Sequence, residues 1–161
     1  MSQDQTPAST DTANAAVRPP FAWLLAIAAG LAANRLYPLP FVPAPVPAAA
    51  AGFVIFALAF ALGIWAIVTI RRAGTQVETY KPTTAIVAGG PYRFTRNPIY
   101  LGMMLGLIGL AIAFDSLWLL LALIAFYLVI RYGVVAREEA YLERKFGDAY
   151  LAYKARVRRW L

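Results

Sequence analysis

Four apolar blocks dominate this chain, and each is bounded by charged or turn-forming residues. They cover residues 21–36, 48–70, 99–114 and 117–135. A helix needs roughly 20 residues to cross the hydrocarbon core of a bilayer, or about 17 at the short end. The second and fourth blocks meet that length, and flanking residues such as Pro98 can extend the others. The blocks therefore predict an all-α membrane protein with four transmembrane helices.

Composition supports this class and narrows the chemistry. Of 161 residues, 61% are hydrophobic and 14% charged, whereas soluble domains have about 45–50% apolar and about 25% charged residues. The chain has no cysteine and no histidine, which excludes thiol catalysis and removes the commonest neutral-pH base and zinc ligand. We expect no metal site. Catalysis would have to rely on positioning a reactive group, which favours a cofactor.

The first 20 residues are mostly small or polar and cannot bury enough apolar surface to offset their ordering entropy. We predict a disordered cytoplasmic tail over 1–20 and a single membrane domain over 21–161. The first apolar block could instead be a signal peptide, since Arg18 precedes it and Ala32 and Ala33 close it. The proline-rich stretch 37–47 favours a chain reversal between two spans.

Orientation follows from the distribution of positive charge. With four spans, 14 of the 15 Lys and Arg residues lie on one side and Arg35 lies on the other. The positive-inside rule then places both termini and the loop 71–96 in the cytoplasm of a multi-pass protein, in a bacterial inner membrane. Asp115 and Ser116 would turn a tight helical hairpin on the far side. The positive charge suits anionic membrane lipids, and nucleic acid is not an expected partner.

The chain continues past the fourth span with helical periodicity over 136–154. Its apolar positions recur at helical spacing, at Leu142, Phe146, Ala149, Tyr150 and Tyr153. The pattern predicts an amphipathic helix along the membrane interface. On this evidence alone, the helix could serve only to anchor the chain end.

The loop 74–92 is longer than the 2–8 residues that usually join two membrane helices. It contains Ile86, Val87 and Tyr92 among several turn formers. Long loops in compact proteins are commonly functional or disordered. We expect this one to fold back onto the helices.

The third span begins at Asn97, a good N-cap, followed by Pro98, which suits the first helical turn. A helix start binds anions readily, and Arg96 would strengthen binding of a carboxylate. Tyr100 adds a ring and a hydroxyl group. The alternative is an ordinary capped helix with arginines that reach the interface.

Glycines recur along the third span at Gly102, Gly106 and Gly109. This spacing permits close approach of another helix or of a ligand, and it would allow a homodimer.

Glu138 and Glu139 lie one turn past the fourth span and point about 100° apart on a helix. Only one is expected to face inward, where it could hold a cation or a hydroxyl-bearing ligand. The alternative is a solvated acidic pair next to surface Lys or Arg, worth about 0.3–0.5 kcal/mol.

Residues 90–102 (GPYRFTRNPIYLG), the helical hairpin, and residues 138–153 (EEAYLERKFGDAYLAY) together resemble the isoprenylcysteine carboxyl methyltransferase and phospholipid methyltransferase superfamily. The resemblance covers about residues 74–153, half of the chain. It implies an integral membrane enzyme that takes a methyl group from S-adenosylmethionine without a Rossmann domain. The chain indeed lacks a strand, Gly-rich turn and helix pattern.

The resemblance also assigns the site. The residues expected to bind the cofactor are Thr84, Ala85, Ile86, Val87, Tyr92, Arg96, Asn97, Pro98, Ile99, Tyr100, Glu138 and Glu139. Glu138 is expected to face Tyr100 across a cavity closed by the loop 74–92. Family members often have histidine where this chain has Asn97, so a protonated imidazole is not available here. Arg131 and Arg137 are the candidates for orienting a substrate carboxylate.

The implied reaction is methyl transfer to a lipophilic acceptor at the cytoplasmic membrane face. The acceptor could be a prenylcysteine-like carboxylate, a phospholipid amine or a thiol. An in-line displacement depends mainly on positioning and needs no obligatory general base. Glu138→Ala and Tyr100→Ala are expected to weaken cofactor binding, whereas Arg159→Ala is not. The alternatives are an NADPH-dependent membrane reductase, similar over the same C-terminal motifs but with more spans, and a non-catalytic membrane scaffold or lipid-binding module.

Overall fold

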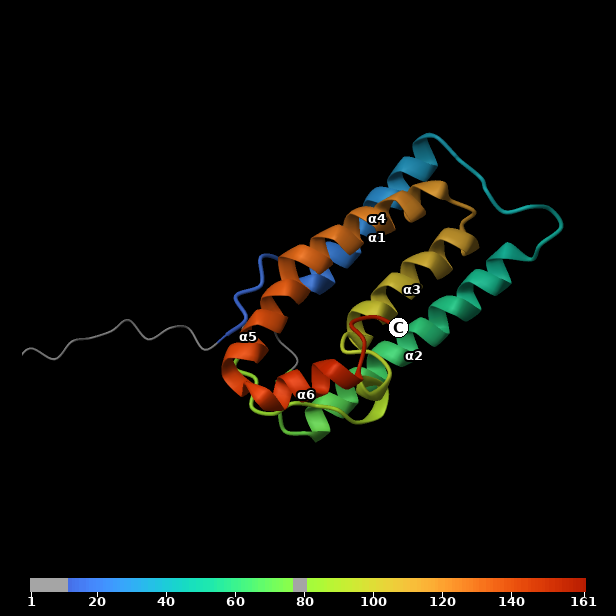
Figure 1. The fold of residues 1–161 in the computed structure, drawn as a ribbon. Helices are drawn as coiled ribbons and strands as arrows, with labels where there is room; N and C mark the ends of the chain where they lie inside the picture. The colour runs from blue at the N-terminus through green and yellow to red at the C-terminus, as the bar shows by residue number, and fades with distance from the viewer. Residues whose placement is uncertain (1–11, 77–80) are drawn as a thin grey trace, which may run out of the picture.

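The computed structural model of the chain describes residues 12–76 and 81–161, and within these residues every regular element is a helix. Residues 1–11 of the expected tail and residues 77–80 of the long loop lie outside this part. Figure 1 shows the arrangement of the helices. They are α1 (Pro19–Leu36), α2 (Ala48–Arg72), η1 (Gly90–Arg93), α3 (Pro98–Ala113), α4 (Leu117–Ile130), η2 (Arg131–Val135), α5 (Ala136–Phe146) and α6 (Asp148–Arg156).

The four long helices lie side by side and enclose a small core. α2 packs along α3, α1 packs along α4, and α3 also contacts α4 (Figure 1). Leu107, Leu119 and Ile130 are fully buried between them. Trp23 of α1 donates from Nε1 to the carbonyl oxygen of Met103 in α3, at 2.8 Å. The predicted all-α class is therefore confirmed.

The glycines of α3 pack against helices rather than a ligand. A Cβ atom on Gly109 would lie 2.7 Å from the backbone nitrogen of Phe56, and one on Gly102 would lie 2.9 Å from the carbonyl oxygen of Ala59. Both neighbours are backbone atoms of α2, so only glycine permits this separation. Gly106 faces the Trp23 ring of α1.

The turn between α3 and α4 is the expected tight hairpin. Asp115 adopts a positive φ of 44° between the end of α3 and the start of α4. Its Oδ1 accepts hydrogen bonds from the backbone of Phe41 and Val42, at 2.7 and 2.8 Å. The turn therefore fixes the proline-rich connector 37–47, which reverses the chain between α1 and α2.

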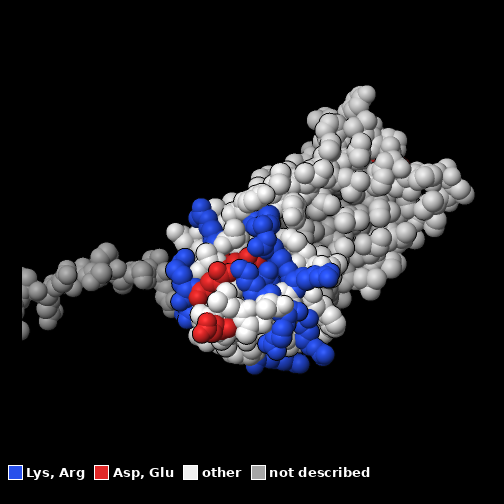
Figure 2. All heavy atoms as spheres, viewed as in Figure 1, with Lys and Arg blue, Asp and Glu red and all other residues white. Residues whose placement is uncertain are grey.

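In the described part of the chain, two helices are long and apolar enough to cross a membrane: α2, and the continuous helix Leu117–Phe146. Only 11% of the most apolar stretch of α2 and 28% of that of Leu117–Phe146 are buried inside the protein. The core helix of a soluble protein would be mostly buried. α3 is apolar but shorter, and α1 is not among the candidates. By length and composition, two of the four expected spans are thus supported. Figure 2 shows Lys and Arg gathered at the end that carries α5 and α6.

The helix expected over 136–154 is two helices. α4 continues without interruption through the π-helical turn η2 into α5, and Gly147 then breaks the helix with a φ of 51°. A positive φ is easily adopted by glycine and ends the helix, so α6 turns back across this end of the bundle (Figure 1). The helical periodicity could not reveal this break, because it continues in phase on both sides of Gly147.

Residues 12–18, assigned from the sequence to a disordered tail, contact the helices. The backbone nitrogen of Ala16 donates to the carbonyl oxygen of Gly133 at 2.9 Å, and Arg137 Nη1 donates to the carbonyl oxygen of Asn14 at 2.9 Å. Ala13 is 8% exposed. α1 also begins two residues earlier than expected, at Pro19, where proline fits a first helical turn.

Candidate functional site

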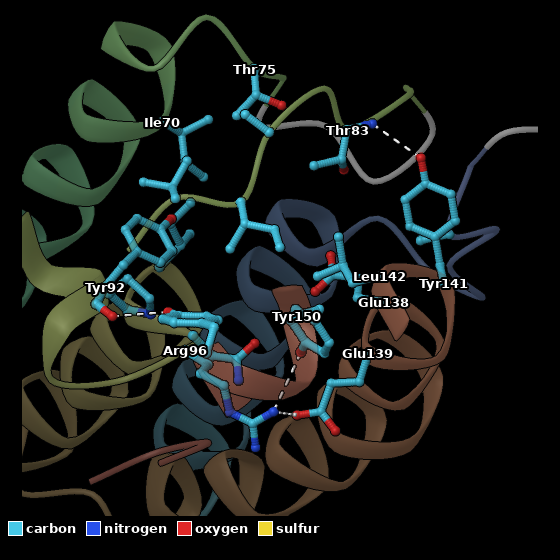
Figure 3. A pocket seen from close by; sticks show the side chains of 18 of the residues that line it. Ile70, Thr75, Thr83, Tyr92, Arg96, Glu138, Glu139, Tyr141, Leu142 and Tyr150 are labelled. Atoms are coloured by element: carbon cyan, nitrogen blue, oxygen red, sulfur yellow. Dashed lines mark hydrogen bonds and ion pairs between the residues drawn. The ribbon is translucent and has the colours of Figure 1, made fainter. Parts of the chain in front are cut away.

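A cavity of about 140 Å³ lies where the loop 73–97, α5 and α6 meet the end of the helical bundle. Figure 3 shows side chains from all of these elements converging on it. Its wall consists of Ala13, Ile70, Thr75, Gln76, Thr83, Ala85, Ile86, Val87, Tyr92, Arg96, Asn97, Pro98, Ile99, Tyr100, Glu138, Glu139, Tyr141, Leu142, Tyr150 and Tyr153. The lining combines a few charged groups with many apolar and aromatic ones, as small-molecule sites commonly do.

Eleven of the twelve residues that the resemblance assigned to cofactor binding line this one cavity. The exception is Thr84, whose neighbour Thr83 lies in the wall instead. Thr84 stabilises the loop: its backbone nitrogen donates to Thr75 Oγ1 at 2.9 Å, and its hydroxyl donates to the carbonyl oxygen of Gly74 at 3.1 Å. The structure thus gathers the predicted set, while its role in binding stays a prediction.

Glu138 faces Tyr100 in this cavity. The Tyr100 hydroxyl donates to Glu138 Oε1 at 2.6 Å, joining α5 to the first turn of α3. Within residues 12–76 and 81–161, the ion pairs of the acidic side chains involve Glu139 and Glu143, and none involves Glu138. The cavity therefore presents a carboxylate that is held by a neutral donor and has no cationic partner among the described residues.

Glu139 has the opposite environment, although it is the next residue. Its carboxylate accepts from Arg159 Nε at 2.8 Å and from Arg159 Nη2 at 2.5 Å, and it pairs with Arg96 Nη1 at 3.1 Å. Arg96 Nη1 also donates to the Tyr150 hydroxyl at 3.4 Å (Figure 3). Two guanidinium groups thus neutralise Glu139, which suits a structural role in the wall.

Arg96 has a buried donor group without a partner among the described residues. Its side chain is 8% exposed, and its Nε is buried without a hydrogen-bond partner in the described part of the chain. A buried donor without a partner costs about 1–3 kcal/mol. Because Arg96 lines the cavity, an acceptor atom of a bound molecule is the natural partner for this N–H group.

Asn97 stands at the expected N-cap position of α3, but its side chain caps nothing. Its Nδ2 donates instead to the carbonyl oxygen of Arg159, at 3.0 Å. A carbonyl oxygen can only accept, so this contact fixes the amide with its donor toward the C-terminal segment. The oxygen Oδ1 is left as the free acceptor of Asn97. The sequence could not show this, since the competing carbonyl belongs to the chain end.

Tyrosines close the cavity from the side of the long loop. The hydroxyl of Tyr153 donates to the carbonyl oxygen of Tyr92 at 2.9 Å, and the Tyr141 hydroxyl accepts from the backbone nitrogen of Thr83 at 3.2 Å. Burial raises the pKa of Tyr153 to about 12, and it also raises the pKa of Tyr92. Both phenols therefore stay protonated and neutral at physiological pH. The loop is folded back onto α5 and α6, as expected.

Arg131 and Arg137 do not line the cavity. The Arg131 guanidinium lies over the ring of Tyr132, 5.3 Å from its centroid, and Arg137 holds the backbone of Asn14. The structure thus places both candidates for orienting a substrate carboxylate outside the wall. Their position on the helix could be read from the sequence, but the side to which they turn could not.

Several wall residues and one supporting residue were not predicted from the sequence. Tyr150 and Tyr153 were assigned to an interfacial face, because periodicity identifies an apolar face but not what covers it. Arg159 was expected to be remote from the site, yet it binds Glu139 directly. A usable signal did exist, since a carboxylate near the membrane interface is costly to leave without a partner.

Comparisons with known proteins identify the family of the chain. A family described as phospholipid methyltransferase matches residues 47–149, a stretch that runs from α2 into α6. An uncharacterized protein of Haemophilus influenzae is 46% identical over 63 residues, which are 39% of this chain and 100% of that protein. No solved structure matches the chain. On the match over residues 47–149, the chain belongs to the phospholipid methyltransferase family, as the motifs in its sequence indicated.

Proposed function

We propose that this protein is an S-adenosylmethionine-dependent methyltransferase that acts on a lipophilic acceptor at the cytoplasmic face of the membrane. The observation that carries the proposal is the Glu138 carboxylate, which lines the cavity beside Tyr100 and, within residues 12–76 and 81–161, has no cationic partner. Family membership supports the reaction class, and the apolar outer faces of α2 and α4 support a membrane location.

The polar groups of the cavity fit this cofactor. S-adenosylmethionine carries a sulfonium, an ammonium and a carboxylate group. The wall offers a carboxylate at Glu138, a buried donor without a partner at Arg96 Nε, and an acceptor at Asn97 Oδ1. The Glu138 carboxylate would attract the cationic groups of the cofactor. Arg96 Nε would donate to its carboxylate, and Asn97 Oδ1 would accept from one of its hydroxyl groups. Ile86, Val87 and other apolar residues of the wall would accept the adenine ring.

When bound, S-adenosylmethionine supplies a methyl group on a cationic sulfur. The residues of the chain would contribute binding and orientation, since an in-line displacement depends mainly on placement. Tyr100 would hold the Glu138 carboxylate in a fixed position. The tyrosines and the folded-back loop would exclude water, which strengthens electrostatic attraction within the cavity.

The charge of the cavity bears on the acceptor. Arg96 is the cation in the wall, and Glu139 and Tyr150 already occupy its Nη1. Arg131 and Arg137 lie outside. Among the described residues of the wall, an acceptor carboxylate would therefore find no unpaired cationic side chain to bind it. This arrangement supports a lipid amine or a neutral lipophile over a prenylcysteine-like carboxylate.

Orientation is part of the proposal. Lys and Arg gather at the end of the molecule that carries the cavity (Figure 2), and positive charge favours the cytoplasmic side. The cofactor would then enter from the cytoplasm, and the acceptor would enter sideways from the bilayer.

The test is incubation of membranes containing the protein with methyl-labelled S-adenosylmethionine, followed by mass spectrometry of the extracted lipids. Lipid amines, prenylated carboxylates and lipophilic thiols are offered in separate arms. We expect label in a lipophilic product, and none with Glu138→Ala. Calorimetric titration in detergent gives an independent readout, and absence of binding of both S-adenosylmethionine and its demethylated product would refute the proposal.

A further inference from the structure

We propose that the C-terminal segment 157–161 positions the wall of the cavity, with Arg159 as the residue through which it acts. Arg159 does not line the cavity itself, so it is a positioning residue. The inference rests on the proposed function, because the effect it predicts is on binding of the adenosyl ligand.

The backbone of this segment holds the start of α3. The backbone nitrogen of Arg96 donates to the carbonyl oxygen of Arg158 at 2.9 Å. The next carbonyl, of Arg159, accepts from Thr95 Oγ1 and from Asn97 Nδ2, each at 3.0 Å. Three consecutive residues at the entry to α3 are therefore bound to two consecutive carbonyl groups of the chain end.

The Arg159 side chain holds α5 at the same time. Its guanidinium forms a two-pronged contact with Glu139, through Nε at 2.8 Å and Nη2 at 2.5 Å. Planar two-pronged pairs between arginine and carboxylate are among the strongest and most directional polar contacts in proteins. Glu139 passes this constraint on to Arg96, whose Nη1 lies 3.1 Å from Oε1.

Trp160 anchors the segment against the bundle. It packs against the buried core, and its ring lies 5.8 Å from that of Tyr127 in α4. The segment thus joins α4, α5 and the start of α3 at one point. Arg96, Asn97 and Glu139 of the wall are all held by residues 158 and 159.

Without the Arg159 side chain, Glu139 would keep only its pair with Arg96. Glu139 and Arg96 would then lose part of the contact network that fixes their positions in the wall of the cavity. The backbone contacts of residue 159 could persist, since they do not involve its side chain. The expected consequence is weaker ligand binding by a folded protein.

The experiment compares Arg159→Ala with Arg158→Ala in the full chain. Arg158 is adjacent to Arg159, and it is exposed. Its replacement by alanine removes the same charge but keeps the backbone carbonyl that contacts Arg96. We expect Arg159→Ala to raise the dissociation constant for S-adenosylmethionine about tenfold, as loss of one charge-assisted contact would. Arg158→Ala should stay within about twofold of the wild type. Thermal unfolding in detergent verifies that both variants are folded.

A double-mutant cycle with Glu139→Gln separates positioning from general loss of structure. If Arg159 acts through Glu139, the double variant should bind about as weakly as the weaker single variant, because contacting residues are not additive. Arg159→Lys should restore only part of the affinity, since lysine lacks the planar fork.

The outcomes are distinguishable. Equal affinities of Arg159→Ala and Arg158→Ala, or fully additive effects with Glu139→Gln, would overturn the inference while leaving the proposed function intact. Failure of the wild type to bind S-adenosylmethionine and its demethylated product would overturn the proposed function, and the positioning role in ligand binding with it.

Discussion

The interface between α2 and α3 and the cavity at the end of the bundle are held together in opposite ways. At the α2–α3 interface, Gly109 and Gly102 bring backbone against backbone, and no polar side chain is needed. At the cavity, Glu139, Arg96 and Arg159 from three separate segments depend on one another.

The two kinds of contact make the two regions vulnerable to different substitutions. An interface made of backbone contacts tolerates no added volume, so its failure should be a failure of folding. A wall made of side-chain contacts can lose one member while the bundle stays intact, so its failure should be a failure of binding. The following substitutions test this distinction.

The largest effect is expected from Gly109→Val. The first added carbon would lie 2.7 Å from the backbone nitrogen of Phe56 and 2.8 Å from the carbonyl oxygen of Gly52. Overpacking typically costs about 1–3 kcal/mol and can cost more against rigid backbone. We expect a markedly lower unfolding temperature in detergent. The matched control is Gly63→Ala in α2, where an added carbon meets nothing within 4 Å. Similar stability of the two variants would contradict the account of this interface.

Much of this interface could be predicted from the sequence. The spacing of Gly102, Gly106 and Gly109 depends only on local helix geometry, so it revealed a close-packed face. It did not distinguish a helix from a ligand as the neighbour. The helix boundaries predicted from the sequence were also close to the observed ones, except where Gly147 breaks the last helix through its positive φ.

The second prediction concerns Glu138→Gln, which removes the negative charge and keeps the shape. We expect binding of S-adenosylmethionine to weaken at least about tenfold, because a carboxylate without a cationic partner would be the main attraction for the sulfonium. Glu143→Gln is the control, since Glu143 pairs with Lys154 away from the cavity. Titration calorimetry measures both. An unchanged affinity for Glu138→Gln would remove the basis of the proposed site.

Tyr100→Phe should have a smaller effect, of about threefold to tenfold on the same affinity. It removes the hydroxyl that donates to Glu138 at 2.6 Å but leaves the carboxylate in place, and such bonds to charged groups contribute about 1.5–3 kcal/mol before the carboxylate finds another donor. Tyr132→Phe, at an exposed tyrosine, is the comparison. If the two variants bind equally, Tyr100 does not position Glu138.

Thr75→Val tests the fold of the long loop. The Thr75 hydroxyl is buried and accepts from the backbone nitrogen of Thr84 at 2.9 Å, whereas valine of similar shape cannot accept. We expect about a threefold loss of ligand affinity and faster hydrogen exchange over residues 81–88. Thr69→Val, whose hydroxyl bonds within α2, should change neither. Unchanged exchange in the Thr75 variant would show that this bond does not hold the loop.

The smallest effect is expected from Arg131→Ala, within about twofold for both ligand binding and product formation. Arg131 lies over the Tyr132 ring and outside the cavity wall. A large loss of turnover confined to a carboxylate acceptor would contradict this and restore Arg131 as a substrate-orienting residue.

The site was only partly predictable, for a physical reason. Residues 96–100 and 138–139 stand in continuous motifs, so their identity was evident. Arg159 follows the last helix by three residues, and its contact with Glu139 spans 20 positions. Contacts between distant segments depend on how helices pack, which the order of residues does not state. The same holds for the direction in which Asn97 turns its amide.

The helix that carries Glu138 and Glu139 begins among the apolar residues of α4, and no break separates the two parts. Helices of this kind adjust to bilayers of different thickness by changing their tilt. A change of tilt in α4 would be transmitted along a rigid rod to both carboxylates, while the start of α3 would follow its own helix. The thickness of the surrounding bilayer would thereby alter the distance between Glu138 and Tyr100, even when no ligand is bound.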